Sequence, residues 1–265
     1  MTGTNELTGL GTDVHFGVVG HRSSGKSYLL YGGLGLLQQI YPDRFNQIDK
    51  NRETDILTKK SRIDQQQGIQ TNVEDWYRAT QLIYKAPGRL MPYHLFCYDV
   101  AGEKFDADKR SRQTGLEFYR NVQSIMFVID VEALDLSGVP ASDDITEWID
   151  QQRTDEKYDI INTLSVIVDI FKNQAGRKTK DIDINIVCVK KDKGYFEAVG
   201  YDSDSVTSKE IETFICYELG LNGLVSSAKA EFKTVTFYAT SVISKNTDSL
   251  KYLFQNVLKQ QGIRF

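Results

Sequence analysis

The strongest constraint on the fold is a loop motif near the start of the chain. Residues 20–27 read Gly-His-Arg-Ser-Ser-Gly-Lys-Ser, and the apolar run 14–19 just before them has the character of a β-strand. A strand that enters a G-x-x-x-x-G-K-S loop and leaves it as a helix wraps backbone N–H groups around a phosphate, at the positive end of the helix dipole. The alternative, a glycine-containing turn without a ligand, fits this order of strand, loop and helix less well.

The motif predicts a role for each of its side chains. Lys26 is expected to reach the β and γ phosphates of a nucleotide, and Ser27 is expected to ligate Mg²⁺. The residues expected to surround the nucleotide belong to the loop and the first turn of the helix: Gly20, His21, Ser23, Ser24, Gly25, Lys26, Ser27 and Tyr28.

Composition narrows the class of protein. The 265 residues include 32 basic and 36 acidic side chains, a net charge of −4, and nothing in this balance suggests a nucleic-acid partner. Three widely spaced cysteines in apolar segments favour buried, reduced thiols: Cys97, Cys188 and Cys216. No apolar run approaches the length of about 20 residues that is needed to span a bilayer. The first six residues lack the features of a signal peptide. We therefore expect a cytoplasmic protein without a membrane span.

Strand-like and helix-like segments alternate along the chain, which predicts an α/β domain with a mostly parallel sheet. The polar segment 41–70 has no clean periodicity and reads as a long connection with room for one helix. The other expected elements are a helix over 26–40, a hairpin of strands 75–85 and 92–100, buried strands over 124–131 and 181–189, an amphipathic helix around 160–171, a helix capped at Thr207 and stopped at Gly220, a strand over 232–238 and a helix over 248–261.

An acidic motif follows the hairpin. Residues 99–103 read Asp-Val-Ala-Gly-Glu where an apolar strand finishes, and the carboxyl ends of strands in an open α/β sheet carry the ligand. Asp99 is therefore expected to hold Mg²⁺ directly or through water, and the N–H of Gly102 is expected to meet the γ phosphate. The alternative is a carboxylate that only begins a turn.

The two motifs resemble the phosphate loop and the D-x-A-G-Q switch-two box of Ras-like GTPases. The resemblance implies a P-loop NTPase fold, a three-layer α/β domain whose sheet has about six mostly parallel strands and one antiparallel edge hairpin. It spans residues 14–265 as a single domain with insertions around 41–70 and 136–180, after a flexible tail over residues 1–13.

The resemblance also implies a threonine, in the loop before the hairpin, that closes over Mg²⁺ and the γ phosphate. Thr71 stands in that place, and Thr54 and Thr58 are alternatives in the same loop.

A base-recognition box is suggested by residues 189–192. Their sequence Val-Lys-Lys-Asp is similar to the N-K-x-D box, in which the lysine, here Lys190, packs on the purine and the aspartate, here Asp192, accepts hydrogen bonds from guanine N1 and N2. Adenine lacks those donors, so an unpaired carboxylate would discriminate against it by about 10⁴-fold. Val189 replaces the usual Asn or Thr, which removes one hydrogen bond that braces the loop.

The last box of the family, a short S-A-K turn after the final strand, has two candidates. Ser227-Ala228-Lys229 matches by letter but precedes the strand 232–238. Ala239-Thr240-Ser241 follows that strand, and we assign Thr240 and Ser241 to the base by position.

Two departures from the family pattern affect hydrolysis. Glu103 stands where Ras-like proteins have the glutamine that orients the attacking water, and Arg22 replaces a small glycine of the loop. Their opposite charges suggest that Arg22 and Glu103 pair near the γ phosphate, and that intrinsic GTP hydrolysis is slow without a partner. Arg22 acting as a cis arginine is the alternative. Turnover left unchanged by Glu103→Gln would contradict the pairing.

The resemblance therefore implies a molecular switch that binds GTP and GDP with Mg²⁺ and hydrolyses GTP slowly, stimulated by a partner. A protein effector or activator would read the switch loops around Thr71 and residues 102–115. A P-loop ATPase and a non-hydrolysing structural subunit are the alternatives, and dimerisation across the nucleotide stays open. The insertions also give a weak likeness to GTPase-like domains of bacterial multi-gene defence or signalling systems.

Overall fold

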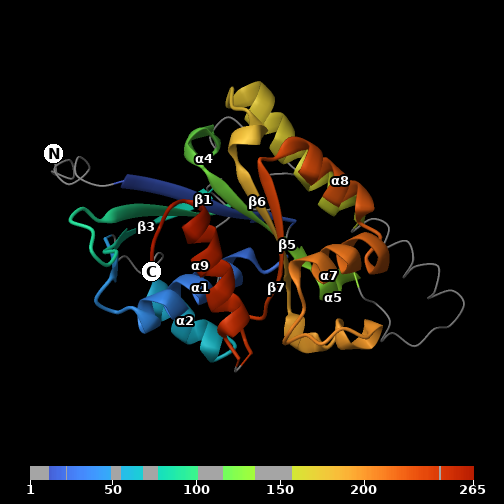
Figure 1. Ribbon diagram of the computed structural model, residues 1–265, viewed down its shortest axis with the longest axis horizontal. Helices are drawn as coiled ribbons and strands as arrows, with labels where there is room; N and C mark the ends of the chain where they lie inside the picture. The colour runs from blue at the N-terminus through green and yellow to red at the C-terminus, as the bar shows by residue number, and fades with distance from the viewer. Residues whose placement is uncertain are drawn as a thin grey trace, which may run out of the picture.

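The computed structural model describes residues 12–21, 23–48, 55–67, 77–100, 116–134, 157–244 and 246–265. These residues form an α/β fold around one seven-stranded mixed sheet, in the order β2-β3-β4-β1-β5-β6-β7 (Figure 1). Within these ranges, no helix combines the length and the apolar character needed to cross a membrane.

The strands of the sheet are mostly parallel. Their bounds are Thr12–Gly20 for β1, Phe45–Gln47 for β2, Tyr77–Tyr84 for β3, Tyr93–Val100 for β4, Ser124–Asp130 for β5, Asp183–Val189 for β6 and Thr234–Ala239 for β7. Strands β4, β1, β5, β6 and β7 pair in parallel, whereas β3 runs antiparallel to both β2 and β4. The carboxyl ends of the parallel strands therefore meet at one edge of the sheet.

Helices cover both faces of this sheet. Their bounds are Lys26–Ile40 for α1, Ile56–Asp64 for α2, Leu116–Asn121 for α4, Val131–Leu134 for α5, residues 157–169 for an unlabelled helix that continues as a wider turn over Ile170–Gln174, Ser208–Thr213 for α7, Asn222–Glu231 for α8 and Asp248–Gln260 for α9.

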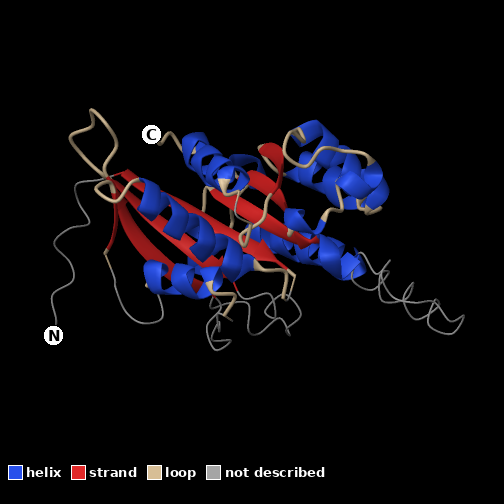
Figure 2. Ribbon diagram, turned by 90° about the horizontal axis from the view of Figure 1, so that it is seen from below, coloured by secondary structure: helices blue, strands red, loops and turns tan. Residues whose placement is uncertain are grey.

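Two hydrophobic clusters hold the three layers together. On one face, β1 residues Phe16 and Val18 join the apolar sides of α1, α2 and α9. On the other face, Val19 and Phe127 join α4, the helix 157–169, α7 and α8. Figures 1 and 2 show the two groups of helices on either side of the strands. Because neighbouring residues of a strand point to opposite faces, a continuous apolar run such as β5 is buried on both sides.

Several predicted elements are confirmed. Helix α1 has the bounds 26–40 that the sequence predicts, and β3 and β4 form the predicted antiparallel hairpin, with Tyr84 opposite Tyr93. Thr207 and Glu210 form the predicted capping box, and Gly220 has the left-handed backbone of a helix stop.

Two predictions of the fold need correction. The sheet has seven strands instead of about six, because residues 45–47 of the predicted connection pair with β3 as the short strand β2. The predicted flexible tail ended at residue 13, but Thr12 and Asp13 belong to β1 and pair with β4. The first eleven residues lie outside the described ranges.

The glycines of α1 allow other helices to approach it closely. A Cβ atom at Gly33 would lie 2.0 Å from the ring of Phe254 on α9, and one at Gly35 would lie 2.6 Å from Lys60 on α2. The close neighbours of these two glycines therefore lie on α9 and α2.

We predict that Gly33→Ala destabilises the protein despite the higher helix propensity of alanine. The new methyl group would overlap the fully buried Phe254 ring, and overpacking of this kind costs about 1–3 kcal/mol. Urea unfolding would measure the loss. The matched control is Gly223→Ala in α8, where the new Cβ meets nothing within 4 Å and a gain of up to about 1 kcal/mol is expected. Equal urea midpoints for Gly33→Ala and the parent chain would contradict the prediction.

Candidate functional site

The predicted phosphate loop connects β1 to α1 at the carboxyl edge of the sheet. Gly20 and Gly25 have left-handed backbone angles, with φ of 151° and 84°, and Ser23 has a φ of 59°. A Cβ at Gly20 would lie 2.6 Å from the carbonyl oxygen of Val128, so only glycine allows β5 to approach the loop this closely. The chain then enters α1 directly after Gly25, which leaves the first N–H groups of the helix directed toward the loop.

Lys26 folds back over this loop. Its side chain is buried, with a relative exposure of 7%, and its ammonium group donates a hydrogen bond to the carbonyl oxygen of His21. The same Nζ lies 3.4 Å from Ser24 Oγ. A positive charge is therefore held against the backbone that the motif predicts will surround a phosphate.

Ser27 and Asp99 meet beside the loop. Ser27 Oγ donates to Asp99 Oδ2 at 2.6 Å, because the parallel register sets Val18 of β1 opposite Asp99 of β4. Asp99 is buried, with a relative exposure of 7%. A hydroxyl and a carboxylate oxygen form a donor set that suits Mg²⁺, whose adjacent octahedral ligands lie about 2.9 Å apart when the metal–oxygen bonds are about 2.05 Å. The pair fits the predicted metal site in both chemistry and spacing.

The predicted base-recognition loop begins at the end of β6. Lys190 has a left-handed backbone, with φ of 62°, and its ammonium group lies 2.8 Å from Asp130 Oδ2 and 2.6 Å from Glu132 Oε2. Partial burial alone would lower the pKa of Lys190, but the hydrogen bonds with the two carboxylates outweigh it and raise the pKa. The hydrogen bond from Lys190 in turn lowers the pKa of Glu132. Lys190 and Glu132 are therefore both charged at neutral pH.

Asp192 and Ser241 come from the segments that follow β6 and β7. Ser241 Oγ donates a hydrogen bond to Asp192 Oδ1. The backbone joins the same two loops, because Lys191 N donates to the carbonyl oxygen of Thr240 at 3.2 Å, and Thr240 N donates to that of Cys188 at 2.9 Å. The alternative candidate, Ser227-Ala228-Lys229, lies within α8, where Lys229 pairs with Glu212 at 2.6 Å.

A tyrosine braces the loop in which Val189 stands at the first position of the predicted base-recognition box. Tyr195 donates its hydroxyl to the carbonyl oxygen of Val189 at 2.7 Å. Burial raises the pKa of Tyr195 well above its usual value, so the hydroxyl stays protonated and remains a donor. Val189 also lies close to the phosphate loop, since its Cγ2 is 3.8 Å from the position of a Cβ on Gly25.

Other predicted site residues make contacts away from this centre. His21 Nε2 lies 3.5 Å from Asp159 Oδ2 on the helix 157–169. Tyr28 donates its hydroxyl to the carbonyl oxygen of Gln67 at 3.0 Å. Thr58, an alternative to Thr71, donates its hydroxyl to Asp55 at the first turn of α2.

Four predicted residues lie outside the described ranges: Arg22, Thr71, Gly102 and Glu103. The same holds for Thr54. Arg22 and Glu103, whose pairing was predicted, therefore have no described geometry.

Sequence reasoning missed Asp130, Glu132 and Tyr195. Asp130 ends the buried strand β5 in the same way as Asp99 stands near the end of β4, so the signal that singled out Asp99 was present here as well. Nothing in the local sequence pairs Glu132 with Lys190, because 58 positions separate them.

Together these contacts line one edge of the sheet with a glycine loop, a buried lysine, a hydroxyl–carboxylate pair and a second carboxylate braced by Ser241. No protein-family model matches the chain, and no curated protein matches it in sequence.

Proposed function

We propose that the chain is a guanine-nucleotide-binding switch that binds GTP and GDP with Mg²⁺ and hydrolyses GTP slowly with the help of a partner protein. One observation carries the proposal. The loop with Lys26, the Ser27–Asp99 pair and the Asp192–Ser241 pair follow or end neighbouring parallel strands at the same edge of the sheet. In open α/β sheets, ligands bind at that edge, where the strand order reverses.

The phosphate half of the proposal rests on the loop. Lys26 would exchange its contact with the His21 carbonyl for phosphate oxygens, and the backbone N–H groups at the start of α1 would receive the same phosphates. Bound Mg²⁺, held by Ser27 and Asp99, would neutralise part of the phosphate charge. A protein catalyses phosphoryl transfer mainly by positioning the reacting groups and neutralising their charge.

The guanine half of the proposal rests on Asp192. Its carboxylate accepts from Ser241 through Oδ1, and a carboxylate has acceptor capacity left for the N1 and N2 donors of guanine. Lys190, two positions before it, is held by Asp130 at the end of β5 and by Glu132 in α5. The acceptor oxygens of the Asp192 carboxylate favour a base with two adjacent donors, which is guanine.

A competition titration tests the proposal. Fluorescent GDP would be bound to the full-length, nucleotide-stripped chain in Mg²⁺ and displaced by GDP, GTP, ADP or ATP. We expect guanine nucleotides to displace it at least about 100-fold better than adenine nucleotides. Equal displacement would favour the ATPase alternative. Absence of binding would favour a nucleotide-free structural subunit, and binding of GTP without phosphate release over many hours would favour a non-hydrolysing one.

The ion pairs of Lys190 give a further prediction. Asp130→Asn keeps an acceptor for the Glu132 N–H, which donates to Asp130 Oδ1 at 3.1 Å, but removes one of the two charges that hold Lys190. We expect the affinity for GDP to fall about tenfold, the equivalent of one charge-assisted hydrogen bond.

Glu212→Gln is the control for this change. It removes the charge from the Lys229–Glu212 pair, which has the same kind of geometry but joins α7 to α8. Its GDP affinity is expected to stay at the parent value. Equal GDP affinities for the parent chain and Asp130→Asn would show that these carboxylates do not support the nucleotide site.

A further inference from the structure

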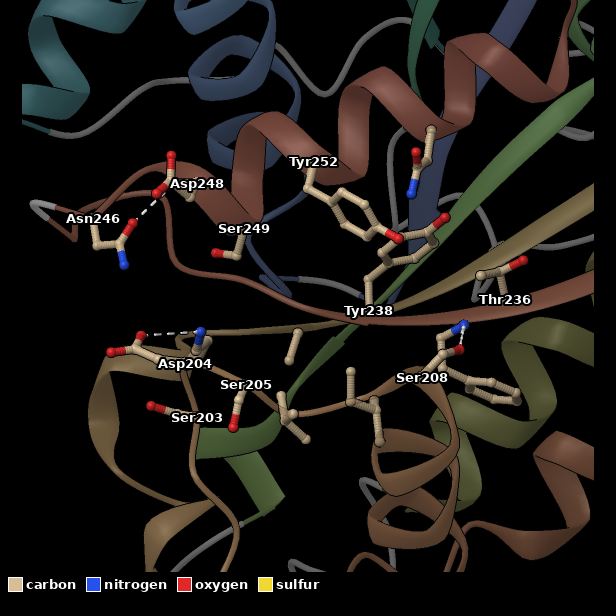
Figure 3. Close-up of a pocket in the computed structure, with 16 residues that line it drawn as sticks. Ser203, Asp204, Ser205, Ser208, Thr236, Tyr238, Asn246, Asp248, Ser249 and Tyr252 are labelled. Carbon is tan, nitrogen blue, oxygen red and sulfur yellow. Dashed lines mark hydrogen bonds and ion pairs between the residues drawn. The ribbon is translucent and has the colours of Figure 1, made fainter.

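A cavity of about 530 Å³ lies beside the last strand of the sheet, β7. The strand forms its floor, the start of α9 forms one wall, and the start of α7 with the turn before it forms the other (Figure 3). We call it the edge cavity. Its volume falls within the range of about 300–1,000 Å³ typical of small-molecule sites.

The edge cavity is rich in planar hydrogen-bonding groups. Four carboxylate or amide side chains line it: Asp204, Asn246, Asp248 and Asn256. Each offers two polar atoms on one planar group, which can form hydrogen bonds with two adjacent hydroxyl groups of a ring at the same time. Hydroxyl groups of Ser203, Ser205 and Ser249 add groups that both donate and accept.

The charge of the lining disfavours an anionic ligand. Two aspartates, Asp204 and Asp248, stand against one lysine, Lys191. The ammonium group of Lys191 lies 3.6 Å from Asp204 Oδ1, so this aspartate partly offsets its charge. A phosphate would therefore meet a lining of net negative charge, whereas a neutral ligand with many hydroxyl groups would meet donors and acceptors.

Two tyrosine rings supply an apolar surface among these polar groups. The ring centroids of Tyr238 and Tyr252 lie 6.2 Å apart. Tyr238 is buried, whereas Tyr252 is 61% exposed and points from α9 toward Tyr238 and β7 (Figure 3). Burial raises the pKa of Tyr238 to about 12, so its hydroxyl stays protonated at neutral pH. An exposed aromatic face beside hydrogen-bonding groups suits a ring with one apolar and one hydroxylated surface.

We infer that the edge cavity is a binding site for a neutral sugar ring, distinct from the proposed nucleotide site. A smaller cavity of about 70 Å³ adjoins it, shares Lys191, Asn246 and Ser249 with it, and is also lined by Asp192 and Ser241. A sugar in the edge cavity would therefore lie next to the proposed base-recognition pair, with no need to enter the phosphate loop.

Nuclear magnetic resonance titrations of the full-length, nucleotide-stripped chain would test this inference. The probes are maltose, ribose and glucose 6-phosphate, each followed through backbone amide shifts. We expect maltose or ribose to shift the amides of Lys191, residues 236–239 and residues 246–256, with glucose 6-phosphate weaker than either. A preference for maltose would indicate a hexose chain as the natural ligand, and a preference for ribose would indicate the pentose of a nucleoside.

Two tyrosine variants make the test specific. Tyr252→Ala removes the exposed ring and is expected to weaken the sugar about three- to tenfold. Tyr217→Ala removes a tyrosine that is 78% exposed outside the cavity and should leave sugar binding unchanged. The inference is overturned by shifts confined to other parts of the chain, by tighter binding of glucose 6-phosphate, by equal sugar affinity of Tyr252→Ala and the parent, or by no shift with any probe.

Discussion

Lys26→Ala is expected to weaken the binding of both GDP and GTP about 10³-fold, the largest loss that we predict for a single substitution. The buried ammonium group of Lys26 is the cation that lies against the predicted phosphate loop, on the carbonyl of His21 and beside Ser24. In the proposed complex it would make two charge-assisted hydrogen bonds to phosphate oxygens, each worth about 2 kcal/mol. Titration with fluorescent GDP would measure the loss.

The fold should survive this substitution, since it removes a buried charge at the first residue of α1 instead of apolar contacts from the core. Urea unfolding of Lys26→Ala would check that point. Lys233→Ala is the control, because Lys233 is exposed at the opposite edge of the sheet, where β7 begins. A GDP affinity of Lys26→Ala within a few-fold of the parent value would leave the loop without a phosphate-binding role.

Asp192→Asn is expected to change the base preference from guanine to xanthine. Guanine offers two adjacent donors at N1 and N2, which suit a carboxylate. Xanthine has a carbonyl in place of the N2 amino group, and it therefore suits a side-chain amide that donates one hydrogen bond and accepts another. We expect the affinity for GDP to fall at least about 100-fold while the affinity for xanthosine diphosphate rises. Competition titrations with the two diphosphates would measure the exchange.

The chain offers matched controls for this second result. Ser241→Ala removes the hydroxyl that donates to Asp192 and should weaken GDP binding. Ser227→Ala changes the serine of the alternative Ser227-Ala228-Lys229 candidate, which is exposed on α8, and should leave GDP binding unchanged. If the Asp192→Asn variant still bound GDP more tightly than xanthosine diphosphate, Asp192 would not be the residue that recognises the base. If ADP also competed as well as GDP, the ATPase alternative would replace the GTPase proposal.

Local signals predicted the elements that carry the proposed site. The loop motif and the apolar pattern after it placed α1 at its observed bounds, and continuous apolar runs placed β5 and β6 to within about two residues. The strand β2 was missed because three residues hold no usable periodicity, and its existence depends on pairing with β3 more than 30 positions later.

The parts of the candidate site that escaped prediction depend on contacts between distant segments. Lys190 was singled out by its motif, but its left-handed backbone and its two carboxylate partners depend on the position of β5 beside β6. Tyr195 replaces the missing brace of Val189 through a hydrogen bond that no motif describes. Ser241, assigned to the base by its position after β7, donates to Asp192, because the position relative to β7 decides which serine reaches the loop.

The packing of α9 against α1 has a consequence for synthesis on the ribosome. Helix α1, directly after the phosphate loop, is buried in part by Phe254, Leu250 and their neighbours on α9. A nascent chain that has emerged only as far as β7 therefore has the whole loop motif but lacks the native cover of the helix behind it. Until residue 260 has left the exit tunnel, the apolar face of α1 is available to chaperones or to other nascent chains. Because α9 is translated after the other elements, its packing on α1, the helix behind the loop, forms only late in the synthesis of the domain.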